Sequence, residues 1–177
     1  MVFIVMGVSG SGKTTVGKAL SKRFGWKYYE GDEYHPAGNI EKMKRGIPLD
    51  DEDRLPWLQS LRKIIEEAAN KNENIVIACS ALKEAYREIL RGHVPDLPLS
   101  ANNEVKFIYL KGSYNTIKER MEKRPDHFFK PEMLKSQFNT LEEPQDAIII
   151  DISKPNQETI SDVIESVRGY LSYQKKD

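Results

Sequence analysis

The sequence predicts an α/β fold in three layers, a five-stranded parallel sheet with helices on both faces. Five short apolar runs alternate with segments of helical periodicity, which is the pattern of successive β–α–β units. Four of these runs, FIVM, IVIA, FIYL and IIID, are almost continuously apolar, as expected for strands buried on both faces. The length of 177 residues favours a single domain, residues 1–177, with one full core.

In chain order the predicted elements are strand 2–6, helix 13–24, strand 27–30, helices 36–45 and 53–70, strand 74–79, helix 82–91, strand 105–110, helices 114–124 and 131–142, strand 147–151 and helix 156–172. The first helix is indicated by Val16, Ala19, Leu20 and Phe24, which recur at helical spacing. Residues 92–104 contain two prolines and small polar residues, so they are predicted to form a surface loop.

A glycine-rich segment follows the first strand directly. Residues 7–14 read GVSGSGKT, which is the phosphate-binding pattern G-x-x-x-x-G-K-[ST]. Its backbone N–H groups are expected to surround a β-phosphate, with Lys13 reaching the β- and γ-phosphates and the Thr14 hydroxyl binding Mg²⁺. The alternative is a glycine-rich turn that binds no nucleotide. The strand before the segment and the helix after it, which directs its positive end at the same anion, favour the phosphate loop.

Composition narrows the classes of protein further. Lys and Arg together number 27, as do Asp and Glu, so the net charge of zero disfavours a nucleic-acid or membrane-surface partner. No apolar run is long enough to cross a bilayer. The first strand is predicted to start at Val2, so we expect no signal peptide. The single cysteine, Cys79, excludes an internal disulfide and is interpreted as a buried residue at a strand end. We expect a cytoplasmic protein.

A phosphate loop by itself does not distinguish kinases from GTPases or motor ATPases. The guanine-reading pattern N-K-x-D is missing, since the nearest string, residues 70–73, reads NKNE. Motor ATPases carry an acidic residue after an apolar strand, whereas the third strand here ends in Cys79-Ser80. A small-molecule kinase remains, in which the ends of the second and third strands hold the acceptor.

Residues 30–58 suit an acceptor that is a polyhydroxy acid. Asp32 can accept a hydrogen bond or a proton from a hydroxyl group, and His35 can donate to or accept from another. Arg54 can bind a carboxylate through its guanidinium fork, and Arg87 is a candidate for a second anion contact. Each has an alternative: Asp32 as a helix cap, His35 as a turn residue, and both arginines as solvated ion pairs.

Taken together, these strings resemble the small phosphate-loop gluconokinases, relatives of shikimate kinases and nucleoside monophosphate kinases. The residues that carry the resemblance are 6–13, Gly31, Asp32, His35, Pro36, Asn39, Lys42, Met43, Gly46, Pro48, Leu49, Asp51, Asp53, Arg54, 56–58, 79–83, Tyr86, Arg87, His127, Phe128, Gln137, Phe138 and 140–142. The resemblance covers nearly the whole chain. It implies ATP-dependent phosphorylation of D-gluconate at its terminal hydroxyl, with Mg²⁺ as cofactor, and it also implies a homodimer.

The same resemblance assigns roles to individual residues. The implied ATP-binding residues are Gly7, Val8, Ser9, Gly10, Ser11, Gly12, Lys13, Thr14, Thr15 and Arg120. The implied substrate-binding residues are Asp32, His35, Arg54, Arg87, His127 and Gln137. The implied catalytic residues are Lys13, Asp32, Arg120 and Arg124, with Asp32 also holding the Mg²⁺ through a water molecule. Adenine is expected between Arg120 and residues 151–155.

Residues 120–142 are dense in charge and are predicted to form a helical lid that closes over the phosphates. Arg120 and Arg124 share a helix face, so the alternative for this pair is an ordinary charged surface. The alternative for His127 is a packing residue within the lid.

Two rival functions remain. One is a kinase for shikimate or another sugar acid, and the other is a non-catalytic nucleotide-binding module, which has no need to keep Asp32 and Arg54.

Overall fold

The computed structural model describes residues 1–92, 105–123 and 131–174. Most of the predicted loop at 92–104 and part of the predicted lid therefore lie outside the described residues. The strands are β1 (Val2–Met6), β2 (Lys27–Glu30), β3 (Ile75–Ala78), β4 (Val105–Lys111) and β5 (Ile148–Asp151). The helices are α1 (Lys13–Phe24), the short 3-10 helix η1 (Gly31–Tyr34), α2 (Ala37–Lys44), α3 (Asp51–Asn70), α4 (Glu84–Arg91), α5 (Tyr114–Glu122), α6 (Pro131–Thr140) and α7 (Asn156–Gln174).

The five strands form one parallel sheet in the order β2-β3-β1-β4-β5, which confirms the predicted fold class. Every residue of β1 and β3 is buried, as their unbroken apolar sequences require. The chain crosses to the other side of β1 between β3 and β4. The carboxyl end of β1 is thus a topological switch point, where open α/β sheets form a crevice that binds ligands.

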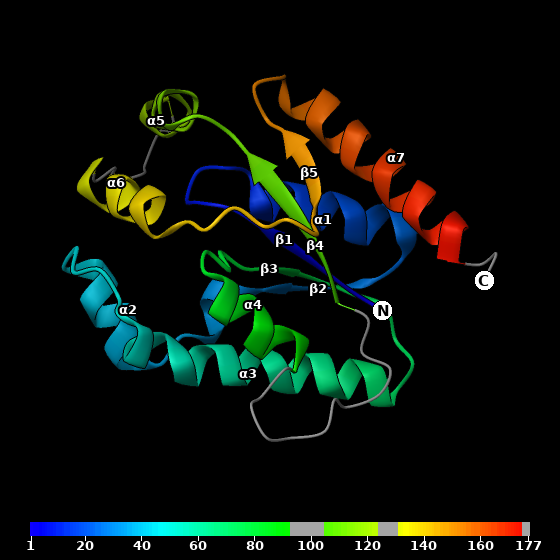
Figure 1. Ribbon diagram of the computed structural model, residues 1–177, viewed down its shortest axis with the longest axis horizontal. Coiled ribbons are helices and arrows are strands. Elements are labelled where there is room, and N and C mark those ends of the chain that lie inside the picture. The colour runs from blue at the N-terminus through cyan, green and yellow to red at the C-terminus, as the bar shows by residue number, and fades with distance from the viewer. Residues whose placement is uncertain (93–104, 124–130, 175–177) are drawn as a thin grey trace.

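Helices cover both faces of the sheet (Figure 1). On one face, α3 and α4 pack against the sheet around a core that includes Trp57, Leu61 and Ile77. On the other face, α1, α5 and α7 enclose a second core around Phe3, Leu20 and Val163. The amphipathic helices therefore bury their apolar sides against a sheet that is apolar on both faces. Within the described ranges, no helix has the length and hydropathy needed to cross a membrane.

Two helices lie away from these layers, at the end of the molecule where the strands have their carboxyl ends. In Figure 1, α6 lies above α2 there, at the left of the view. Helix α6 ends two residues before the predicted limit of 142, because the Glu142 N–H donates to the Leu82 carbonyl at 2.8 Å instead of continuing the helix. Helix α6 is thereby tied to the segment that follows β3.

The start of α4 also differs from its predicted limit of residue 82. Ala81 has a left-handed backbone conformation, with φ of 44°, and Lys83 is an extended N-cap. The chain after β3 therefore makes an irregular turn before the helix begins. The unpredicted 3-10 helix η1 occupies the corresponding place after β2. Its first residue is glycine because a side chain on Gly31 would collide with the Ala78 carbonyl oxygen.

Candidate active site

The phosphate loop connects β1 to α1 at the carboxyl end of the central strand. Gly7, Gly10 and Gly12 have φ values of 142°, 80° and 99°, a region that residues with side chains rarely adopt. The Lys13 ammonium bends back over the loop and donates to the Val8 carbonyl at 3.0 Å. The N-cap residue of α1 is Gly12, which has no side chain to cap the helix. A helix start of this kind directs backbone N–H groups toward an anion.

A pocket of about 210 Å³ lies against the phosphate loop and is called the phosphate pocket here. It is lined by Ser9, Gly10, Gly12, Lys13, Thr14, Thr15, Glu30 and Asp32. A lysine ammonium, two threonine hydroxyls and two carboxylates at the end of β2 form a donor set that fits phosphates together with Mg²⁺. Glu30 was missed by the sequence analysis, although its place at a strand end is the signal that pointed to Asp32.

A second pocket, called the acceptor pocket here, adjoins the first and shares Ser9, Lys13 and Asp32 with it. Its other lining residues are His35, Met43, Pro48, Leu49, Arg54, Ser80, Met133, Ser136, Gln137 and Thr140. They lie just after η1, in α2 and the segment that follows it, in the first turn of α3, after the end of β3 and in α6, so the pocket lies in the crevice between α2 and α6. Its volume is about 90 Å³. Small-molecule sites usually enclose about 300 Å³ or more, so this pocket as it stands is narrow for a ligand.

Tight packing holds His35 in the wall of the acceptor pocket. The imidazole stacks on the buried indole of Trp57, with ring centroids 4.2 Å apart and planes 15° apart. The Trp57 Nε1–H in turn donates to the Gly31 carbonyl at 2.7 Å. Burial lowers the pKa of His35 below its ordinary value, and the nearby Asp32 carboxylate opposes this effect only in part. His35 is therefore a neutral, oriented polar group at neutral pH.

Arg54 lies in the first turn of α3 with its guanidinium over the Tyr86 ring, 5.6 Å from the centroid. Its Nε–H makes a long hydrogen bond to the Leu49 carbonyl, at 3.4 Å. The neighbouring Asp51 is already paired, since its carboxylate accepts from Lys83 at 2.7 Å and from the Tyr86 hydroxyl. Among the described residues, no carboxylate forms an ion pair with Arg54. The end of its guanidinium fork is available to an acidic ligand, which disfavours the alternative of a solvated ion pair.

Gln137 reaches from α6 to the phosphate loop. The Ser9 N–H donates to Gln137 Oε1 at 2.6 Å, and Gln137 Nε2 donates to the Ser9 hydroxyl at 2.9 Å. Gln137 also lines the acceptor pocket. The residue thus connects α6 to the loop, a contact that the sequence did not indicate.

The structure does not bring Arg87 into the acceptor pocket. Its side chain is 1% exposed, and it donates to the carbonyls of Ala81 and Leu82 at 2.9 and 3.2 Å and to the Glu84 carboxylate at 2.5 Å. These hydrogen bonds support the irregular turn after β3. Arg87, expected as a second anion contact, is therefore corrected to a structural position, and Arg54 stays the candidate for binding an acidic ligand.

Arg120 lies outside both pockets. Its guanidinium donates to the carbonyls of Ile152 and Lys154, the latter at 2.8 Å, in the loop between β5 and α7. This is the loop that the sequence analysis connected with adenine. Arg124 and His127, predicted as catalytic and substrate-binding residues, lie outside the described residues.

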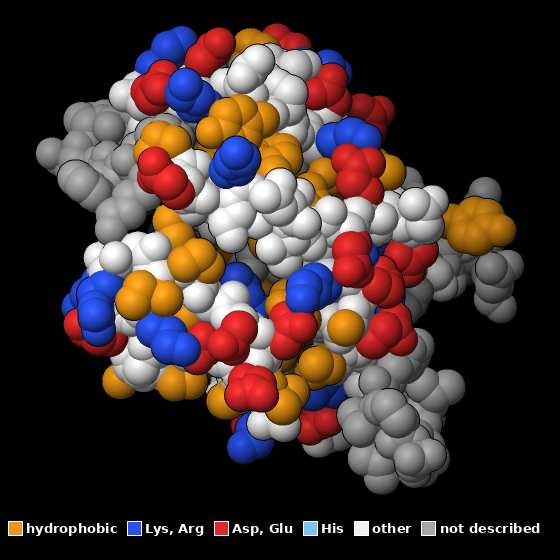
Figure 2. Space-filling model, turned by 60° about the vertical axis from the view of Figure 1, so that its left-hand side comes forward, with side chains coloured by type: hydrophobic (Ala, Val, Ile, Leu, Met, Phe, Trp, Pro, Cys, Tyr) orange, Lys and Arg blue, Asp and Glu red, His pale blue; other side chains and the backbone are white. Residues whose placement is uncertain are grey.

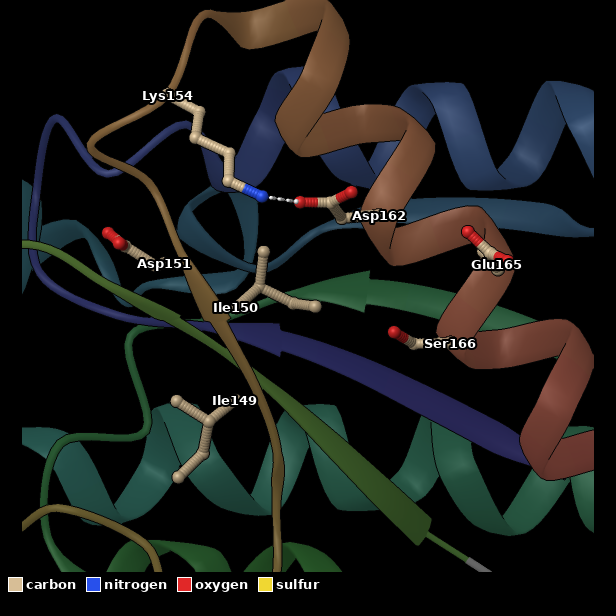
Figure 3. Close-up of a pocket in the computed structure, with 7 residues that line it drawn as sticks. All are labelled: Ile149, Ile150, Asp151, Lys154, Asp162, Glu165 and Ser166. Atoms are coloured by element: carbon tan, nitrogen blue, oxygen red, sulfur yellow. Dashed lines mark hydrogen bonds and ion pairs between the residues drawn. The ribbon is translucent and has the colours of Figure 1, made fainter.

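A third pocket lies at the edge of the sheet between β5 and α7, with a volume of about 390 Å³. Figure 3 shows an ion pair between Lys154 and Asp162 at its upper end, with the nitrogen and oxygen 2.8 Å apart. Ile149 and Ile150 line its floor, and the pocket shares no residue with the acceptor pocket.

On the face drawn in Figure 2, basic and acidic side chains are interspersed, without a large patch of one sign. This face therefore lacks the charge pattern of a nucleic-acid interface.

Known proteins resemble this chain along most of its length. A family model described as shikimate kinase matches residues 9–168. A probable gluconokinase of Mus musculus is 41% identical over 179 residues, which covers 94% of this chain and 97% of the mouse protein. The thermosensitive gluconokinase of Escherichia coli (strain K12) is 48% identical over 155 residues, 85% of this chain and 79% of that protein.

The fold agrees with the sequence relationship. The crystal structure of a gluconokinase from Sinorhizobium meliloti 1021 superposes with a TM-score of 0.82 at 38% identity, covering 98% of this chain and 96% of that one. Identity at this level over nearly whole chains reflects a common fold and a common family. The chain belongs to the gluconokinase family, among the phosphate-loop kinases that the shikimate kinase model describes.

Proposed function

We propose that this protein transfers the γ-phosphoryl group of ATP to the terminal hydroxyl of D-gluconate, giving 6-phospho-D-gluconate and ADP. The observation that carries the proposal is the continuity of the two pockets. Asp32 and Lys13 line both pockets, whereas Arg54 lines only the acceptor pocket. A linear sugar acid bound there would have its carboxylate at Arg54 and its far hydroxyl at the phosphate pocket.

The chemistry proposed for this site depends mainly on positioning and on charge. Asp32 would accept the hydrogen bond of the attacking hydroxyl, orient its oxygen toward the γ-phosphorus and take the proton as the new P–O bond forms. Lys13 and the loop N–H groups would neutralise charge that develops on the phosphoryl oxygens. Mg²⁺ held near Thr14 and Asp32, when bound, would supply further neutralisation of the phosphates.

Closure of the crevice would complete the site. Met43 and Met133, on opposite sides of the acceptor pocket, would exclude water that otherwise competes with gluconate for the phosphoryl group.

We also propose Arg120 and residues 151–155 as the adenine-binding region. Arg124 and His127 stay predictions for the lid, and a homodimer stays a prediction for the assembly.

An assay of ADP release with MgATP tests the proposal. D-gluconate is compared with shikimate, glucose, sorbitol and no acceptor, and the phosphorylated product is identified by mass and by NMR. We expect turnover with gluconate alone. Shikimate tests the relationship to the family model, and sorbitol, which lacks the carboxylate, tests the role of Arg54. Faster turnover with either acceptor than with gluconate would refute the proposed substrate.

A further inference from the structure

The side chain of Asn39 determines which ring nitrogen of His35 carries the proton. Asn39 lies in the first turns of α2 and is 5% exposed. Its Nδ2 donates to the Asp53 carbonyl at 2.7 Å and lies 3.2 Å from His35 Nδ1. A backbone carbonyl can only accept, so the atom facing Asp53 must be the amide nitrogen. The orientation of the amide is therefore fixed by the backbone of α3.

The second hydrogen of this NH₂ group is directed at His35. Nδ1 must therefore act as an acceptor, which places the imidazole hydrogen on Nε2. Stacking on Trp57 prevents the ring from tilting, and the bond to Asn39 prevents it from flipping. No described residue forms a hydrogen bond with Nε2. Since His35 lines the acceptor pocket, Nε2–H is the ring donor left for a ligand.

We infer that Asn39 is a positioning residue that holds His35 as an Nε2–H donor to one hydroxyl oxygen of the acceptor. Asp32, in the same pocket, accepts from a hydroxyl hydrogen. A fixed donor and a fixed acceptor side by side recognise a hydroxyl group by both of its hydrogen-bonding capacities. The identity of the acceptor as gluconate rests on the proposed function, whereas the tautomer and its cause do not.

The tautomer can be measured directly in the unaltered protein. A long-range ¹H–¹⁵N correlation spectrum of the ¹⁵N-labelled chain at about pH 8 resolves the two nitrogens of each imidazole. The sequence has three histidines, so a spectrum of His35→Gln identifies the His35 signals by their loss. We expect the pattern of a neutral ring with its proton on Nε2. A ring protonated on Nδ1, or on both nitrogens, would overturn the inference.

A second experiment links Asn39 to the acceptor. Asn39→Asp replaces the donor with a carboxylate of equal size. In a neutral ring this carboxylate accepts from Nδ1–H and so removes the hydrogen from Nε2, and the ¹H–¹⁵N spectrum of the variant establishes the pH at which its ring is neutral. We expect the KM for gluconate to rise about tenfold or more, with the KM for ATP changed less than about twofold. Asn70→Asp, the same change at an exposed position at the far end of α3, is the matched control. An unchanged KM for gluconate in Asn39→Asp at a pH where its ring is neutral would contradict the inference.

A pair of variants at His35 remains decisive even if Asn39→Asp folds poorly. Glutamine can place an N–H donor near the position of Nε2, whereas leucine has no donor. We expect His35→Gln to keep a KM for gluconate about tenfold lower than that of His35→Leu. Equal values would overturn the inference. Absence of gluconate turnover in the unaltered protein would instead refute the proposed function, and the spectrum would still decide the tautomer.

Discussion

Replacing Arg54 with alanine tests the assignment of the acceptor pocket most directly. The guanidinium lies in the pocket wall, restrained by the Tyr86 ring and the Leu49 carbonyl, and no described carboxylate pairs with it. The variant therefore breaks no ion pair within the described part of the chain. Its effect on stability should be small, while its effect on binding of an acid should be large.

The structure sets the expected magnitude. Hydrogen bonds to charged groups contribute about 1.5–3 kcal/mol each, and a guanidinium fork makes two with one carboxylate. Arg54 is half-buried, so water partly replaces the lost contact. We take about 3 kcal/mol in total, which corresponds to roughly a 100-fold rise in the KM for gluconate. Arg54→Lys keeps the charge without the fork and should give an intermediate rise of about tenfold.

The assay is steady-state ADP release, with gluconate and ATP varied separately. Arg45→Ala, an exposed arginine at the end of α2 that lines neither pocket, is the matched control. Arg54→Ala should raise the KM for gluconate far more than the KM for ATP, because it removes binding of the acceptor only. A rise below twofold, or equal rises for both substrates, would show that Arg54 does not bind the carboxylate.

Four other predictions follow from the site. Lys13→Ala should lower kcat about 1,000-fold or more with an unchanged circular dichroism spectrum, and normal turnover would refute the phosphate-loop assignment. Gln137→Leu should raise the KM for ATP or gluconate by several-fold because α6 loses its two bonds to Ser9; unchanged values would make this contact incidental. Burial raises the pKa of the Cys79 thiol to about 12, so a thiol reagent should label it only after unfolding. Burial lowers the pKa of His35, so the unfolded chain binds a proton at this residue more readily than the folded chain does. The stability that comes from neutral His35 is therefore present above about pH 6.5. It is lost as the pH falls toward the pKa of His35 in the folded protein. Melting temperatures from about pH 8 to 5 should therefore fall less in His35→Gln than in the unaltered protein.

Much of the fold could be predicted because a strand that is buried on both faces has an apolar residue at nearly every position. The runs that became β1 and β3 are apolar at every position, since helices cover both sides of each strand. The phosphate loop and Asp32 could be placed for a related reason. In a parallel sheet, residues after strand ends converge on one edge even when they are far apart in sequence.

Arg87 shows where this reasoning stops. An arginine on a short helix near a predicted site is expected to be exposed, because burying an unpaired charge is unfavourable. Here the left-handed Ala81 turns the carbonyls of residues 81 and 82 toward the helix, and the buried guanidinium satisfies them. The cause is a backbone conformation at a residue that carries no turn signal in the sequence.

The contacts of Gln137 and Asn39 could not be predicted for a different reason. Each acts through a contact between distant segments: α6 with the phosphate loop, and α2 with the start of α3. Hydrogen-bonding amides have no periodicity, and their partners are set by tertiary packing. Only the structure shows that one amide bridges to Ser9 and that the other orients His35.

The distribution of charge along the crevice gives a physical reason for phosphorylation at the terminal hydroxyl. Arg54 lines only the acceptor pocket, whereas the Glu30 carboxylate lines only the phosphate pocket and the Asp32 carboxylate lines both. Gluconate bound in the reverse direction would place its carboxylate beside Asp32 and beside the phosphates of ATP, and it would leave Arg54 without a partner. Like charges brought side by side cost several kcal/mol. The orientation with the carboxylate at Arg54 avoids this repulsion and leaves the opposite end of the chain, the terminal hydroxyl, as the group that reaches the γ-phosphate.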